Sequence, residues 1–112
     1  MDAKHFKNTP VAEVFAVPGL VDYAEGQVVS RTLVQTPNVT VTAFAFAAGE
    51  GLSAHTTPGD AVVQVLDGEA SVTIADVEHA VPAGSSILMP AGVPHAVEAK
   101  DRFKMLLTLV KG

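Results

Sequence analysis

The chain contains no cysteine and no tryptophan, and only seven of its 112 residues are lysine or arginine. Without cysteine it can form no disulfide and offers no thiolate, a composition that suits a reducing cytosol. The net charge of −5 argues against a nucleic-acid partner, because surfaces that bind nucleic acid are basic. No run of about 18 apolar residues and no apolar leader occur, so we expect no membrane segment and a cytoplasmic location.

The remaining composition is that of a globular protein. Apolar residues make up 48% of the sequence and charged residues 17%. A chain of this length is typical of a single domain with one core. We predict that residues 1–27 form an N-terminal arm with one short strand and one helical turn. Residues 28–112 are predicted to form the β-barrel of the same domain.

Short β-branched and apolar runs, separated by turn residues, predict an all-β protein. Strands are expected at 28–34, 39–46, 61–66, 69–75, 77–81, 85–89, 95–99 and 103–110. The dipeptide Asp67-Gly68 favours a type I′ turn, which predicts that the two strands beside it form a hairpin. Short strands at this spacing are typical of a sandwich or a closed barrel.

Two of the four histidines lie in segments rich in glycine and proline. His55 lies within residues 49–60, and His95 closes the segment 84–95. Turn residues restrict the backbone and therefore fix where a neighbouring side chain points. These two histidines are the candidate functional residues of the chain.

Seven positions of the chain have the residues and the spacing of two short motifs: Gly49, His55, Gly68, Gly84, Pro90, Gly92 and His95. In these motifs the chain resembles the cupin superfamily, and specifically the small single-domain bacterial cupins of the RmlC-like type. The resemblance implies a double-stranded β-helix, which is a jelly roll of two antiparallel sheets, also called the cupin barrel.

The chain departs from the family at the positions that bind metal. The first motif of metal-binding cupins supplies a second histidine and a glutamate, where this sequence has Thr57 and Ala61. Of the four usual ligands only His55 and His95 remain, so the metal-ligand motif is degenerate. The resemblance implies a weak site for a divalent metal, namely iron, manganese, nickel or zinc. Sites for these metals usually have three or four protein ligands.

Strand alternation predicts which residues accompany the two histidines. Residues two apart in a strand share a face, and in cupins that face lines the barrel interior. The residues expected to line the pocket are Thr57, Ala61, Val63 and Val97. Asp60 is expected to point outward, and we interpret Met89 and Met105 as core residues.

Three functions are compatible with these residues. The leading interpretation is a barrel that binds a small-molecule ligand through His55 and His95, with metal weak and optional. The second is a metal-dependent dioxygenase or isomerase of the cupin superfamily, which needs a third ligand. The third is a non-catalytic sensor, storage or structural barrel. The N-terminal arm and the strands that are apolar on both faces also favour a homodimer.

Overall fold

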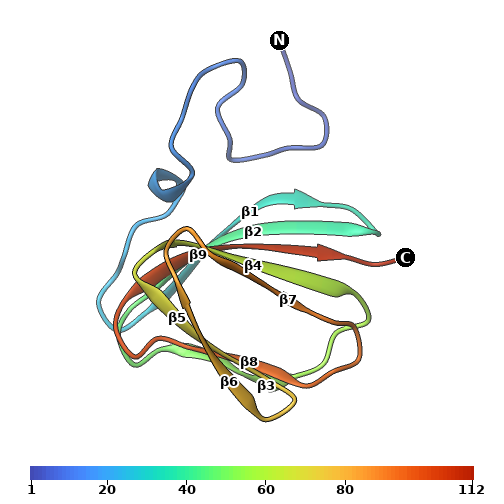
Figure 1. Ribbon diagram of the computed structural model, residues 1–112. Coiled ribbons are helices and arrows are strands. Elements are labelled where there is room, and N and C mark those ends of the chain that lie inside the picture. The colour runs from blue at the N-terminus through green and yellow to red at the C-terminus, as the bar shows by residue number, and fades with distance from the viewer.

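The computed structural model describes all 112 residues, and its regular elements are nine β-strands and one 3-10 helix (Figure 1). In chain order they are η1 Val17–Leu20, β1 Val28–Gln35, β2 Val39–Phe46, β3 Gly51–His55, β4 Asp60–Asp67, β5 Glu69–Ile74, β6 Val77–Pro82, β7 Ser86–Met89, β8 His95–Glu98 and β9 Phe103–Val110. The prediction of an all-β protein is confirmed. The strand bounds agree with the predicted runs to within one residue, and β3 is an additional strand that ends at His55.

The strands form two antiparallel sheets that face each other (Figure 1). One sheet has five strands in the order β1-β2-β9-β4-β7, and the other has four in the order β3-β8-β5-β6. Among strands that follow one another in the chain, only β1 with β2 and β5 with β6 pair as hairpins. The remaining connections cross from one sheet to the other, as in a jelly roll.

The hairpin predicted around Asp67-Gly68 is wrong. Strand β4 pairs with β7 and β9, whereas β5 pairs with β6 and β8, so this dipeptide joins the two sheets. Gly68 has a φ of +73°, but Asp67 is not left-handed, and a type I′ turn needs both. A Cβ atom on Gly68 would lie 2.5 Å from the carbonyl oxygen of Arg102. Glycine is therefore used here for a close crossing between the sheets.

The type I′ geometry occurs instead at the next turn of the chain. Ala75 and Asp76 have φ values of +49° and +67°, and they join β5 to β6. Ile74 and Val77, which flank them, are directly paired across the hairpin. The break between the strands predicted at 69–75 and 77–81 is therefore a tight turn.

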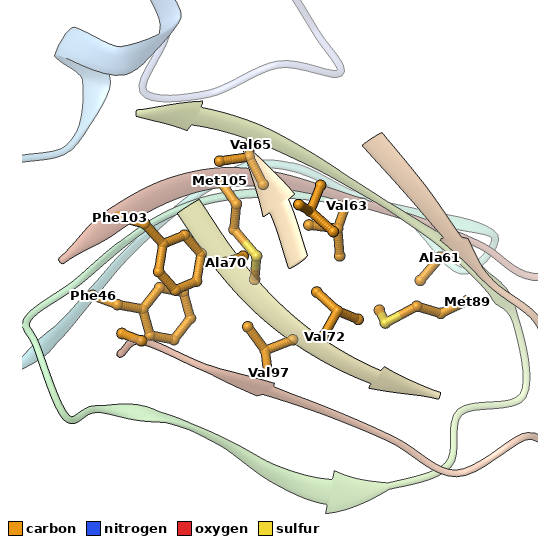
Figure 2. Close-up of a cluster of buried hydrophobic side chains, with 12 residues drawn as sticks. Phe46, Ala61, Val63, Val65, Ala70, Val72, Met89, Val97, Phe103 and Met105 are labelled. Carbon is orange, nitrogen blue, oxygen red and sulfur yellow. The ribbon is translucent and has the colours of Figure 1, made fainter. Parts of the chain in front are cut away.

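The core fills the space between the two sheets (Figure 2). Ala61, Val63 and Val65 alternate along β4 with exposed or half-buried residues, and all three are buried. The rings of Phe46 and Phe103 stack with centroids 4.6 Å apart. Alternating burial of this kind is what a strand with one face on the core requires.

Residues 1–27 differ from the expected arm, because they contain the helical turn η1 but no strand. Asn8 and Ala12 both have a φ of +57°, which interrupts any extended run. The arm is attached to β1, where Lys7 N donates a hydrogen bond to the carbonyl oxygen of Leu33 at 2.9 Å. No helix of the chain has the length and apolar character needed to cross a membrane.

The segment after η1 lies on the outer face of the five-stranded sheet. Val21 packs there against Ala43 and Ala45 of β2. The hydroxyl of Tyr23 donates a hydrogen bond of 2.5 Å to Asp67, and the guanidinium of Arg102 lies 4.5 Å from the ring centroid. Burial raises the pKa of the Tyr23 phenol above its usual value, and the Asp67 carboxylate raises it further.

Candidate functional site

The candidate site lies where two loops meet at one end of the barrel. The loop 56–59 joins β3 to β4, and the loop 90–94 joins β7 to β8. Gly92 N donates a hydrogen bond to the carbonyl oxygen of Thr57 at 2.9 Å. Residues that border either loop are therefore brought to the same end of the molecule.

His55 ends β3 and His95 begins β8, and they are directly paired across these neighbouring strands. Their ring centroids are 4.5 Å apart, and the ring planes meet edge to face at 66°. His95 is 4% exposed, whereas His55 is exposed at the opening. The structure thus brings the two candidate histidines together, although 40 sequence positions separate them.

A β-bulge in β3 sets the direction of His55. Leu52 pairs with Val97 and His55 pairs with His95, so three steps along β3 match two along β8. The additional residue allows Leu52 and His55 to line the same cavity, which regular alternation forbids for residues three apart. The strand pattern of the sequence did not predict this bulge.

The hydrogen bonds of the two rings define their free nitrogens. Nδ1 of His55 lies 2.8 Å from the carbonyl oxygen of Ser53, and Nδ1 of His95 lies 3.2 Å from that of Val93. A carbonyl oxygen only accepts, so each Nδ1 carries the proton, and in the neutral ring Nε2 keeps its lone pair. Neither Nε2 atom has a hydrogen-bond partner in the protein. Among the residues that are not exposed, every fully buried side-chain nitrogen or oxygen atom does have a partner, so Nε2 of His95 is not one of these fully buried atoms. Nε2 of the buried His95 is therefore open to the cavity.

The cavity beside the histidines has a volume of about 50 Å³. Its lining is mostly apolar and consists of Leu52, His55, Thr57, Ala61, Met89, His95, Val97, Met105, Leu107 and Leu109. Three of the four residues expected to accompany the histidines, Thr57, Ala61 and Val97, are in this set. Val63, the fourth, is fully buried in the core instead. It lies two residues further along β4 than Ala61, away from the loop end.

No carboxylate reaches the cavity, and no cluster of three or more histidine, cysteine or acidic side chains is present in the chain. Asp60 points outward as predicted, where its Oδ1 accepts a hydrogen bond of 2.8 Å from Ala91 N. The Thr57 hydroxyl donates to the carbonyl oxygen of Gly59 at 2.9 Å. The Asp60 carboxylate and the Thr57 hydroxyl thus form hydrogen bonds with backbone groups of the two loops.

Two sulfur-bearing side chains that were predicted only as core residues also belong to the site. Met89 and Met105 are 2% and 0% exposed, and both also border the cavity. One signal was available for Met89, because it immediately precedes Pro90 of the second histidine motif.

Together, the two antiparallel sheets and the histidines at the barrel end define a double-stranded β-helix with an internal site. A family model described as the cupin domain matches residues 43–110. The chain belongs to the cupin family, as the motif resemblance predicted. A search of curated proteins finds no match.

Solved structures support this membership. A conserved protein of unknown function from Streptococcus pyogenes is 38% identical, with a TM-score of 0.95 over 98% of this chain and 96% of that one. A cupin superfamily protein from Desulfitobacterium hafniense is 33% identical, with a TM-score of 0.91 over 96% and 98% of the two chains. A cupin 2 conserved barrel domain protein from Leptotrichia buccalis is 46% identical, with a TM-score of 0.84. The latter match covers 87% of this chain and 47% of the other.

Proposed function

We propose that this protein is a cytosolic binding barrel that holds one metal ion, or one molecule of very few atoms, between His55 and His95. The observation that carries the proposal is the hydrogen bonding of the two rings. Each Nδ1 is directed to a backbone carbonyl, which leaves two Nε2 lone pairs beside one cavity. A pair of fixed nitrogen bases in an apolar wall is suited to bind a cation or a hydrogen-bond donor. The lack of cysteine supports the cytosolic location.

The size of the cavity restricts the ligand. Its volume of about 50 Å³ is small beside the roughly 300–1,000 Å³ of sites for drug-sized ligands. A cavity needs only about 10–15 Å³ to hold a water molecule, so an ion with one or two small co-ligands fits. The apolar walls disfavour a charged organic molecule, because its charge would have no partner other than the imidazoles.

The test is metal and ligand binding by matched histidine variants. His55→Ala and His95→Ala are expected to lose binding, measured by calorimetry with zinc, iron, nickel and manganese ions and by metal analysis of the purified protein. Mass spectrometry of a denatured extract would detect a bound organic molecule. His79→Ala is the control, because His79 lies on β6 outside the cavity. Binding that is equal in all three variants would exclude the site.

A metal-dependent dioxygenase or isomerase is less well supported. Such an enzyme needs three or more protein ligands and an open position on the metal. Only two nitrogen ligands from the usual set line this cavity, and the nearby Asp60 is engaged with Ala91. The geometry therefore supports a binding barrel better than a cupin enzyme or a purely structural barrel.

We also propose that two copies of the chain form a homodimer through the N-terminal arm. Val11, Val14 and Phe15 are 40%, 105% and 39% exposed. Leu88 and Val110, which point outward from the five-stranded sheet, are 57% and 51% exposed. Each chain carries both the apolar arm and the apolar sheet face. In a twofold dimer the arm of each copy would therefore cover the sheet face of the other copy, so the same contact would form twice.

A further inference from the structure

We propose that the ion bound at this site is cuprous copper, Cu(I), and that the thioether sulfur of Met89 completes the shell begun by Nε2 of His55 and Nε2 of His95. This inference rests on the proposed function, because it identifies the ion that the same two histidines bind. It adds to the two histidines a third protein ligand, which is a thioether and not a carboxylate.

The backbone places Met89 next to the loop that leads to His95. Met89 ends β7 where the loop to His95 begins, and His55 ends β3 where the loop to β4 begins. The two loops are tied by the hydrogen bond from Gly92 to Thr57. Met89 therefore lies at the end of the barrel that holds both histidines, and all three line one cavity.

Met89 has a small side chain as its neighbour on β4. It pairs directly with Ala61, the position at which the motif of metal-binding cupins has a glutamate. Figure 2 shows the two side chains next to each other, with that of Met89 reaching into the barrel. The small Ala61 side chain thus leaves space beside a flexible thioether, at the position where a carboxylate is missing.

The chemistry of the three donor atoms favours a soft, monovalent ion. Two imidazole nitrogens and one thioether are all neutral, and thioethers favour soft ions such as Cu(I). No carboxylate balances the charge of an ion in this cavity. The cost of removing an ion from water grows with the square of its charge, so an apolar wall penalises a divalent ion more than a monovalent one. Cu(I) also accepts two or three ligands, whereas zinc favours four and magnesium or manganese six.

The absence of cysteine makes the inference straightforward to test. No thiolate competes for Cu(I) anywhere in the chain, so binding reports on histidine and methionine alone. Anaerobic titration against the chromogenic chelator bicinchoninate is expected to give one Cu(I) per wild-type chain. His55→Ala and His95→Ala are expected to abolish that binding.

Met89→Leu tests the thioether with little change in side-chain volume. We expect it to weaken Cu(I) binding by about tenfold or more, the effect that even outer-shell partners have on metal affinity. Ile87→Leu is the matched control, since Ile87 lies on the same strand and packs against the core without lining the cavity. Cu(I) affinity should be unchanged in this variant.

X-ray absorption at the copper edge supplies a readout that does not depend on variant stability. In selenomethionine-labelled Met105→Leu, selenium at position 89 is expected in the first coordination shell of copper. A shell that contains only nitrogen or oxygen would overturn the assignment of Met89. So would equal Cu(I) affinity of wild type and a folded Met89→Leu variant.

The remaining outcomes separate the two proposals. Binding of zinc, iron, nickel or manganese but not Cu(I), with loss in both histidine variants, overturns the copper inference and leaves the proposed function intact. If neither an ion nor an extracted molecule depends on the histidines, both proposals fail. Cu(I) that is retained without His55 and His95 is bound elsewhere, which overturns the copper site.

Discussion

Two glycines with nearly the same backbone angle do different work in this barrel. Gly68 and Gly92 have φ values of +73° and +74°. A Cβ atom on Gly68 would meet the carbonyl oxygen of Arg102 at 2.5 Å, whereas one on Gly92 would meet nothing within 4 Å. The pair therefore separates the effect of backbone conformation from the effect of close packing.

We expect Gly92→Ala to lower the free energy of unfolding by about 1–2 kcal/mol, the cost of a left-handed residue with a side chain. Gly68→Ala should lower the free energy of unfolding by roughly 1–3 kcal/mol more, because the new methyl group also displaces the backbone at Arg102, which leads into β9. Urea unfolding of both variants measures the difference. An equal loss of unfolding free energy in the two variants would show that the backbone around Gly68 accommodates a methyl group without strain.

A second prediction at the residue scale concerns the position where the family motif has glutamate. Ala61→Glu buries a carboxylate beside the two histidines, and Ala61 is only 2% exposed. Without metal, this substitution should destabilise the protein by about 3 kcal/mol or more, as an unpaired buried charge does. Zinc or manganese should then raise its melting temperature more than that of the wild type, because the ion gains a third, charged ligand.

Val62→Glu is the control for this change, since it adds the same charge to the outward face of the same strand. Its melting temperature should not respond to the metal. A response as large as that of Ala61→Glu would show that the added charge acts from the surface, without entering the cavity.

At the scale of elements, η1 and the segment after it are attached to the sheet largely through contacts of Tyr23. The phenol of Tyr23 donates to Asp67, and Lys104 donates to the carbonyl oxygen of Pro18 at 2.8 Å. Arg102 and Lys104 also lie over the Tyr23 ring, 4.5 Å and 5.0 Å from its centroid. These contacts connect the segment before β1 to both β4 and β9.

The pKa of Tyr23 gives this contact a pH dependence. Because burial and Asp67 raise the pKa in the folded state, the folded protein favours the protonated phenol. The resulting stability is present below the ordinary value of about 10 and is lost as the pH rises through the folded-state pKa. Wild-type stability should therefore decline above pH ~10 more steeply than that of Tyr23→Phe.

The chain has a single tyrosine, so phenolate absorbance follows this group directly. The absorbance should appear near the ordinary pH in urea and at a higher pH in the folded protein. Identical titrations in the two states would contradict the contact between Tyr23 and Asp67.

The strands themselves were predictable because burial repeats with a period of two. That pattern placed Ala61 and Val65 on the inner face and Asp60 on the outer one. The partner of β4 was not predictable, because turn preference is local, whereas β4 ends at Asp67 and its partner β9 begins only at Phe103. Motif spacing identified His55 and His95, but no sequence signal marked the bulge that directs His55 or the depth of Val63.

At the scale of the whole molecule, the N-terminal arm leaves apolar side chains without a partner in the chain. Figure 1 shows the first residues lying outside the five-stranded sheet. We expect the wild-type protein to sediment as a dimer and the double variant Val14→Asp, Phe15→Asp as a monomer. A stable dimer buries about 800 Å² per partner, so loss of its apolar centre should be decisive.

Val77→Asp is the control, because Val77 is 56% exposed at the turn between β5 and β6 and the substitution replaces an exposed valine with the same charged residue, once where the double variant has it twice. It should leave the dimer intact. A wild-type monomer, or equal dissociation of both variants, would contradict an interface built on the arm.

The position of β9 governs when this molecule can fold. Strand β9 is formed by residues 103–110, yet it lies in the middle of the five-stranded sheet, between β2 and β4. Until it has been synthesised, β2 and β4 each present an unpaired edge, and such edges attract other chains. The sheet therefore cannot be completed during translation of the earlier strands. Folding must await the emergence of β9, and a ribosome stalled before residue 103 would hold an aggregation-prone nascent chain.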